Sequence, residues 1–105
     1  MSTEWQKKLR RIVLNRDNWI CQYCFKKLVP QNHGATEFEQ VATIDHKIPI
    51  SRCSSVSNAW KLSNLCACCR QCNEGKGALS AIEWLIVLAF RRGEVRLLNE
   101  LQKAA

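Results

Sequence analysis

The sequence predicts one small α+β domain that is stabilised by a bound metal ion. Helical patterns occupy both ends of the chain, residues that favour strands lie in the middle, and cysteines form two Cys-x-x-Cys pairs. A chain of 105 residues is too short for two full domains. Such a chain buries a modest share of its surface, so we expect the seven cysteines to supply part of its stability.

The chain is basic, with 16 Lys and Arg against 9 Asp and Glu, a net charge of +7 and an isoelectric point near 9.3. The expected partner is therefore a polyanion, and nucleic acid is favoured over an anionic membrane surface. The longest apolar run, residues 84–90, is far shorter than the roughly 18 to 20 residues that cross a membrane. No charged and apolar leader opens the chain. We expect a cytoplasmic protein without a membrane span.

The first predicted element is a helix that starts near Glu4, because residues 3–6 have the form of a capping box. One stripe of this helix is mostly apolar and comprises Trp5, Leu9, Ile12, Val13 and Arg16. The remaining surface carries Lys7, Lys8, Arg10 and Arg11. This basic face is either a solvated surface or a phosphate-binding one.

The middle of the chain predicts two strands. Residues 41–46 are rich in strand-forming residues and stop before Pro49. Residues 64–68 supply a second short strand. We expect the two strands to pair as a hairpin with a long loop.

The C-terminal part predicts two helices. A second capping box at residues 80–83 opens the first of them, and Gly93 ends it. Because residues 84–90 are apolar on nearly every face, this helix is either well buried or partly an interface with another chain. A shorter helix is expected over 94–103.

The cysteine spacing predicts a metal site. Cys21, Cys24, Cys69 and Cys72 form two pairs that can offer four thiolates to one tetrahedral zinc ion. In a reducing compartment such pairs bind metal or do redox work rather than form disulfides, and two pairs favour the metal. Cys66 and Cys69 have the same spacing, so the second pair is ambiguous from spacing alone.

The end of the first strand carries the candidate catalytic residues. Asp45 and His46 place a carboxylate next to an imidazole, and adjacent side chains of a strand point to opposite faces. One side chain can therefore hold a metal ion while the other faces the substrate.

Taken together, Asp-His-x-x-Pro at 45–49, Asn-Leu at 64–65 and Cys-x-x-Cys-Asn-x-x-Lys-Gly at 69–77 resemble the HNH endonuclease family. The segment 16–24, Arg-Asp-Asn-Trp-Ile-Cys-Gln-Tyr-Cys, is similar to the start of its zinc-containing branch. The resemblance implies a ββα-metal core over 16–77, an N-terminal helix and a helical extension over 79–103, all in one nuclease domain over 1–105. It also favours Cys69 over Cys66 or Cys68 as a zinc ligand.

The resemblance implies a role for each motif residue. His46 would be the general base, Asp45 and Asn73 would hold one catalytic Mg²⁺ or Mn²⁺, and Asn64 would brace the loop that keeps His46 in place. Asn73 stands where the family name has its second His. Because an amide oxygen is a harder ligand than imidazole, we expect Mg²⁺ or Mn²⁺ to be preferred over Ni²⁺ or Zn²⁺.

These observations predict a metal-dependent nuclease that nicks or cuts DNA with weak sequence preference. The candidate phosphate-binding side chains are Lys47, Arg52, Arg70 and Lys76. The resemblance also indicates a phage or prophage setting and a protein partner such as a packaging terminase. The alternatives are a non-catalytic zinc module that binds nucleic acid, and an interaction module that docks a larger machine through residues 84–90.

Overall fold

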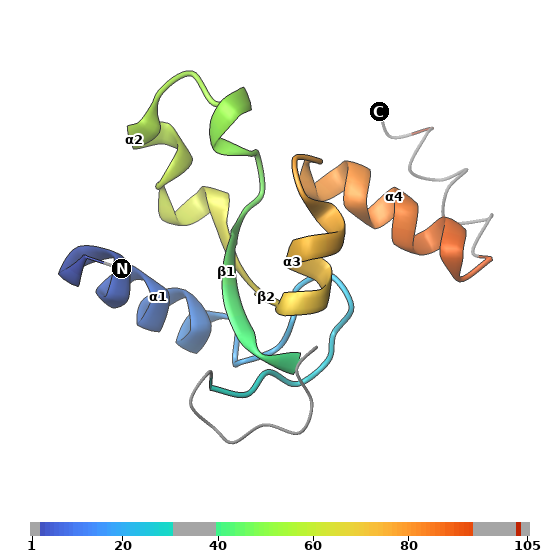
Figure 1. Ribbon diagram of the computed structural model, residues 1–105, viewed down its shortest axis with the longest axis horizontal. Helices are drawn as coiled ribbons and strands as arrows, with labels where there is room; N and C mark the ends of the chain where they lie inside the picture. The colour runs from blue at the N-terminus through green and yellow to red at the C-terminus, as the bar shows by residue number, and fades with distance from the viewer. Residues whose placement is uncertain (1–2, 31–39, 94–102, 104–105) are drawn as a thin grey trace.

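The computed structural model describes residues 3–30, 40–93 and 103. Two short strands lie at the centre with helices around them (Figure 1). In chain order the elements are α1 (Glu4–Arg16), β1 (Ala42–His46), the 3-10 turn η2 (Ile50–Arg52), α2 (Val56–Ala59), the 3-10 turn η3 (Leu62–Asn64), β2 (Leu65–Cys69), α3 (Arg70–Lys76) and α4 (Ala81–Arg91). The expected α+β class is thus confirmed, and no helix of the described residues could span a membrane.

The two strands form an antiparallel hairpin, as expected, with each strand within one residue of its predicted bounds. Asp45 pairs with Cys66 and His46 with Leu65. Helices α1 and α3 contact both strands and lie to either side of the hairpin in Figure 1. Because β2 runs through the middle of this packing, all five of its residues are buried. The hairpin is thereby fixed between two helices, with the end of β1 at the candidate site.

Helix α1 begins with the predicted capping box, in which the Thr3 side chain accepts a hydrogen bond from the Gln6 amide. The predicted apolar stripe is only partly right. Val13 and Leu14 are the buried residues of the helix, whereas Trp5 is 50% exposed. Arg10 reaches across to β1 and donates a hydrogen bond to the backbone oxygen of Ala42 at 2.9 Å. Part of the basic face therefore holds the helix on the hairpin.

Helix α3 begins at Arg70, directly after β2, because the Cys69 side chain caps it by accepting a hydrogen bond from the Cys72 amide. Cys72, Asn73 and Lys76 therefore all lie on this helix. Asn73 and Lys76 are three residues apart, so they occupy one face, and both contact β1.

Helix α4 opens with the predicted capping box of Ser80 and Glu83. Trp84 and Ala89 are buried, while Ile82 and Phe90 are 64% and 73% exposed. The helix is thus buried on one side only, which contradicts the well-buried alternative, and the interface with another chain stays an expectation. The shorter helix expected over 94–103 falls, apart from residue 103, outside the described residues.

Candidate metal centre and active site

Four cysteine thiols converge at the base of the hairpin. The Sγ atoms of Cys21, Cys24, Cys69 and Cys72 all lie within 4.8 Å of one another. The first two come from the turn after α1, and the other two from the end of β2 and the first turn of α3. Four sulfur donors in two Cys-x-x-Cys turns suit a tetrahedral ion such as zinc. The set is the one that the resemblance favours.

Hydrogen bonds to sulfur support this assignment. The amide of Cys24 donates to Cys21 Sγ and the amide of Cys72 donates to Cys69 Sγ, each at 3.4 Å. Hydrogen bonds from the thiols of Cys69 and Cys72 lower the pKa of Cys21 far below its usual range. The same contacts with Cys21 raise the pKa of Cys69 and of Cys72, so one negative charge gathers on Cys21, and a metal ion would displace the remaining thiol protons on binding.

The other cysteines of β2 point elsewhere. Cys66 Sγ lies 3.4 Å from the Tyr23 hydroxyl, and Cys68 Sγ lies 3.2 Å from Thr43 Oγ1. Burial raises the pKa of Cys66 to about 11, so its thiol stays protonated. The structure favours Cys69 over Cys66, because the Cys69 thiol lies with those of Cys21, Cys24 and Cys72, whereas the Cys66 thiol contacts the Tyr23 hydroxyl.

Asp45 is a buried residue whose carboxylate lies on the α3 side of the hairpin. The Tyr23 hydroxyl donates to its Oδ2 at 2.7 Å, and the Lys76 ammonium lies 3.2 Å from the same oxygen. Burial raises the pKa of Tyr23 well above its usual range, so the phenol remains a donor. Asp45 is therefore enclosed by two donors from different parts of the chain.

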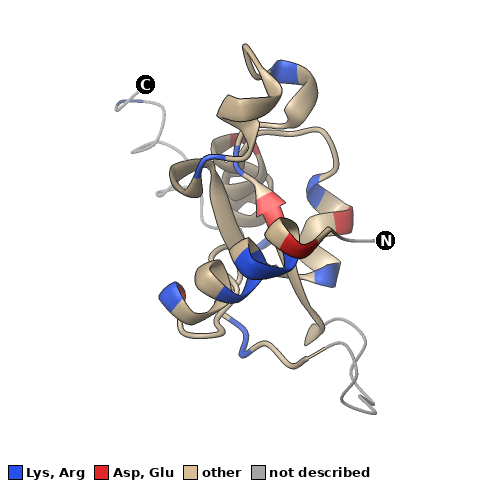
Figure 2. Cartoon of the chain, turned by 90° about the vertical axis from the view of Figure 1, so that its left-hand side faces the viewer, with Lys and Arg blue, Asp and Glu red and all other residues tan. Residues whose placement is uncertain are grey.

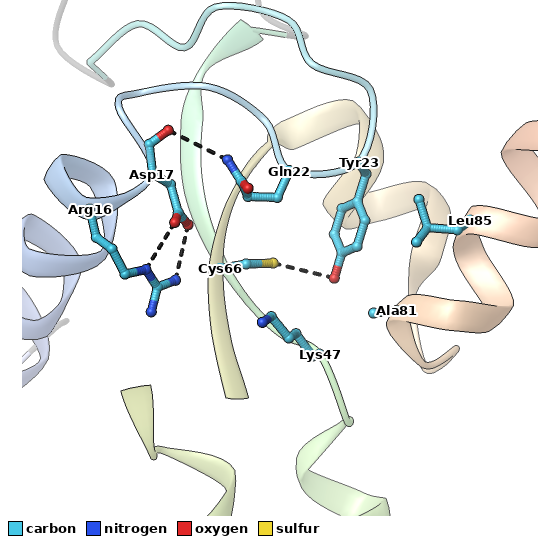
Figure 3. A pocket seen from close by; sticks show the side chains of 8 residues that line it. All are labelled: Arg16, Asp17, Gln22, Tyr23, Lys47, Cys66, Ala81 and Leu85. Atoms are coloured by element: carbon cyan, nitrogen blue, oxygen red, sulfur yellow. Dashed lines mark hydrogen bonds and ion pairs between the residues drawn. The ribbon is translucent and has the colours of Figure 1, made fainter. Parts of the chain in front are cut away.

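A cavity of about 400 Å³ opens beside this group (Figure 3). Tyr23 and Cys66 point toward one another in its wall, and Arg16, Asp17 and Lys47 also line it. Arg16 and Lys47 are the cationic residues of this lining, and the Tyr23 hydroxyl is the one that donates to Asp45. Arg16 is paired with Asp17 at 2.9 Å, so Lys47 supplies the net positive charge of the cavity, and Asp45 lies behind Tyr23 and does not line it.

His46 lies on the opposite side of the hairpin and is half-buried. Its Nδ1 donates to the backbone oxygen of Ala59 at 2.8 Å, because a carbonyl can only accept. The Trp60 ring packs nearly perpendicular to the imidazole, with the ring centroids 4.5 Å apart. With Nδ1 carrying the proton, Nε2 of the neutral ring is left as the acceptor. The ring is thus held in the tautomer that a general base needs.

Asn64 ties together the two ends of the loop between the strands. Its side-chain oxygen accepts from the Ile48 amide at 2.9 Å, and its side-chain nitrogen donates to the backbone oxygens of Ile48 and Ala59. The Lys47 amide donates to the Asn64 backbone oxygen at 2.7 Å. Asn64 therefore fixes the same backbone oxygen that His46 uses.

Asn73 projects from α3 toward β1, where its side-chain nitrogen donates to Thr43 Oγ1 at 3.0 Å. Thr43 and Asp45 alternate along β1 and share its α3 face. A carboxylate and an amide oxygen are chemically suitable ligands for Mg²⁺ or Mn²⁺. The Asp45 carboxylate, however, is enclosed and paired with Lys76, so these side chains do not form an open cation site in this arrangement.

The predicted phosphate-binding residues have different surroundings. Lys47 is half-buried and lines the cavity, Arg52 is paired with Glu83, and Arg70 is paired with Glu74 at 3.0 Å on the surface of α3. Lys76 is 2% exposed and holds Asp45. A phosphate contact from Lys76 does not fit this arrangement, because its ammonium is enclosed. Further Lys and Arg residues lie within α1 itself, along its length (Figure 2).

Two contributors to the site, Tyr23 and Trp60, and the contact of Lys76 with Asp45 were not identified from the sequence. Tyr23 and Lys76 bind Asp45, and Trp60 packs on His46. The Lys76 position was recognised as part of the motif, but nothing local indicated that it is buried. Tyr23 lies inside the first Cys-x-x-Cys pair, and Trp60 follows the loop serines, so neither gave a signal of contact with the motif.

A β-hairpin with a helix across one face and a four-cysteine cluster at its base defines the zinc-containing ββα class of nuclease folds. The family model described as HNH endonuclease matches residues 21–79, more than half of the chain. The chain therefore belongs to the HNH endonuclease family. Neither the curated proteins nor the solved structures gave a match.

Proposed function

We propose that this protein is an endonuclease that hydrolyses phosphodiester bonds in DNA, with His46 as its general base. The observation that carries the proposal is the hydrogen bond from His46 Nδ1 to the backbone oxygen of Ala59. It leaves Nε2 to accept a proton, at the end of the strand where the family motif lies. The net charge of +7 supports a polyanionic substrate.

In the proposed reaction, His46 Nε2 takes a proton from a water molecule whose oxygen attacks the phosphorus in line with the 3′ oxygen. The new P–O bond forms as the bond to the 3′ oxygen breaks. The leaving oxygen takes up a proton from solvent, so the products carry a 5′-phosphate and a 3′-hydroxyl. Asn64 and Trp60 hold the imidazole so that Nε2 keeps its direction.

Lys47, Arg52 and Arg70 are the proposed phosphate-binding side chains, and their role is to position the DNA backbone. Contacts of this kind carry no sequence information, so weak sequence preference is expected. From the resemblance alone, we also propose a phage or prophage setting, a terminase-like partner and a requirement for Mg²⁺ or Mn²⁺. Zinc is the proposed ion of the four-cysteine cluster.

Cleavage of supercoiled plasmid tests the proposal. Wild type and His46→Ala are each incubated with Mg²⁺, with Mn²⁺ and with a chelator that spares the bound zinc. Ser57→Ala, an exposed residue of α2, is the matched control. Relaxed or linear product from wild type and Ser57→Ala, but not from His46→Ala, supports the nuclease and its base.

The rival function gives a different result in the same experiment. If wild type binds the plasmid and retains its zinc but leaves the DNA intact with both metals, the non-catalytic binding module is the better account. A single discrete cut site with the purified protein would contradict weak sequence preference.

A further inference from the structure

The ion pair of Asp45 and Lys76 is almost completely enclosed. The side chains are 8% and 1% exposed, and Nζ lies 3.2 Å from Oδ2 and 3.4 Å from Oδ1 of the carboxylate. The Tyr23 hydroxyl takes the remaining access to Oδ2 at 2.7 Å. Each carboxylate oxygen therefore already faces a donor of this same chain.

The ammonium has few other partners. Nζ also donates to the backbone oxygen of His46 at 3.0 Å, and no acidic residue other than Asp45 forms an ion pair with it in the described part of the chain. Lysine is rarely buried unless it is paired, and a buried ammonium without a counter-ion is costly. Asp45 is therefore the group that keeps Lys76 inside the protein.

A divalent cation bound by the Asp45 carboxylate would have to occupy the position of the Lys76 ammonium. Mg²⁺ binds oxygen ligands at about 2.1 Å and keeps several waters around it. An ammonium on both oxygens of the carboxylate leaves no room for that hydrated ion and repels it at short range. The four-carbon stem of lysine is flexible enough to carry the ammonium away without a shift of α3.

We infer that Lys76 is a built-in competitor for the divalent cation at Asp45, which can bind a metal ion only after the ammonium leaves. The inference rests on the proposed function, since it deepens the metal requirement proposed there. It predicts a protein that binds Mn²⁺ weakly in the absence of DNA. Removal of the ammonium alone should open the site.

Mn²⁺ binding to the zinc-loaded protein without DNA tests this, with electron paramagnetic resonance or calorimetry as the measurement. Lys76→Met should bind Mn²⁺ about tenfold or more tightly than wild type, because one competing charge has been removed. The double variant Lys76→Met with Asp45→Asn should lose this gain in Mn²⁺ affinity. Lys76→Arg should bind Mn²⁺ as weakly as wild type. Lys61→Met removes an equal charge from an exposed position and should change nothing.

Equal Mn²⁺ affinity in wild type and Lys76→Met would overturn the inference. Zinc content and circular dichroism show whether Lys76→Met has folded. If it has not, Lys76→Gln takes its place, because the amide is polar but carries no charge: tighter Mn²⁺ binding than wild type supports the competition, and equal affinity refutes it. Because no DNA is present, these results stand apart from plasmid cleavage, whose failure would count against the nuclease alone.

Discussion

Asn64 and His46 donate hydrogen bonds to one shared acceptor, the backbone oxygen of Ala59, at 3.0 and 2.8 Å. One residue lies just before β2 and the other at the end of β1. The position of the imidazole is therefore set by the loop that joins the two strands, and Asn64 holds that loop through hydrogen bonds from both its side chain and its backbone.

Replacement of Asn64 by Ala should lower activity without removal of any proposed reacting group. The variant loses the bonds to Ile48 and Ala59, so His46 is no longer held on a fixed acceptor. We expect cleavage to fall by up to about 100-fold, since small misplacement of a catalytic group has effects of this size. The free energy of unfolding should fall by about 1 to 3 kcal/mol.

Plasmid cleavage and urea unfolding measure the two effects, with Ser63→Ala as the control at the exposed neighbouring position. An Asn64→Ala protein that unfolds like wild type and cleaves at the wild-type rate would show that the loop needs no brace. A loss of stability with unchanged cleavage would separate the fold of the loop from the orientation of His46.

Cys66 and Cys69, the two alternatives for the third zinc ligand, give opposite predictions when each is replaced by Ser. Cys69→Ser should lose the metal and much of the folded structure, because Cys69 lies in the cluster and also caps α3. Cys66→Ser should keep one zinc per chain, because its thiol contacts Tyr23 instead. Zinc stoichiometry and circular dichroism of the two purified variants provide the comparison.

Chelation of zinc from wild type extends the same test. Removal of the ion should unfold the core, because metal binding and folding are coupled in small domains of this kind. Withdrawal of Mg²⁺ should leave the fold intact. A circular dichroism spectrum that does not change when zinc is stripped would contradict a structural role for the cluster.

Local features of the sequence predicted where α1 and α4 start. Both capping boxes lie within four residues, so Thr3 with Gln6 and Ser80 with Glu83 mark the starts of α1 and α4 without reference to the rest of the fold. The hairpin was also predictable, because strand-forming residues stand out from the polar loop between them. The start of α3 was not predictable in this way, because its cap is the sulfur of Cys69.

The surroundings of the site depend on contacts between distant residues. Tyr23 and Asp45 are 22 residues apart, and Asp45 and Lys76 are 31 apart. No local pattern reports such pairs, and a lysine in a basic chain is expected at the surface. The motif therefore predicted which residues belong to the site, whereas the burial of Lys76 followed only from the packing of α3 on β1.

Asp17 offers a prediction about pH. Its carboxylate accepts from Arg16 and from the amide of Ala67 in β2 at 2.9 Å. Burial alone would raise the pKa of Asp17, but these hydrogen bonds outweigh it and the pKa lies below its usual value. A depressed native pKa stabilises the fold above the unfolded pKa, and this stabilisation is lost as the pH falls through the native value.

Asp17→Ala should therefore lower the free energy of unfolding at pH 7 by about 1 to 3 kcal/mol, because a strand amide loses its partner. The difference from wild type should persist at pH 5 and shrink below about pH 4, where the unfolded carboxyl is protonated. Urea unfolding with excess zinc across this range measures it. A difference that grows on acidification would contradict the assigned role.

The contact between α3 and α4 depends on a glycine without unusual backbone geometry. A Cβ on Gly75 would lie 2.6 Å from Cη2 of Trp84, a side chain that is 2% exposed. Gly75→Ala should therefore force the indole or α3 to shift and should lower the free energy of unfolding by about 1 to 3 kcal/mol. Because Asn73 and Lys76 lie on the same helix, the shift should also reduce cleavage.

Thermal or urea unfolding of Gly75→Ala, with Ala78→Gly as a control at the exposed position after the helix, measures the effect. The double variant Gly75→Ala with Trp84→Leu removes the atom that the methyl group meets. Its loss of stability should be smaller than the sum of the two single losses, because the clash exists only when both groups are present. Additive losses would show that Gly75 is needed for some reason other than the indole.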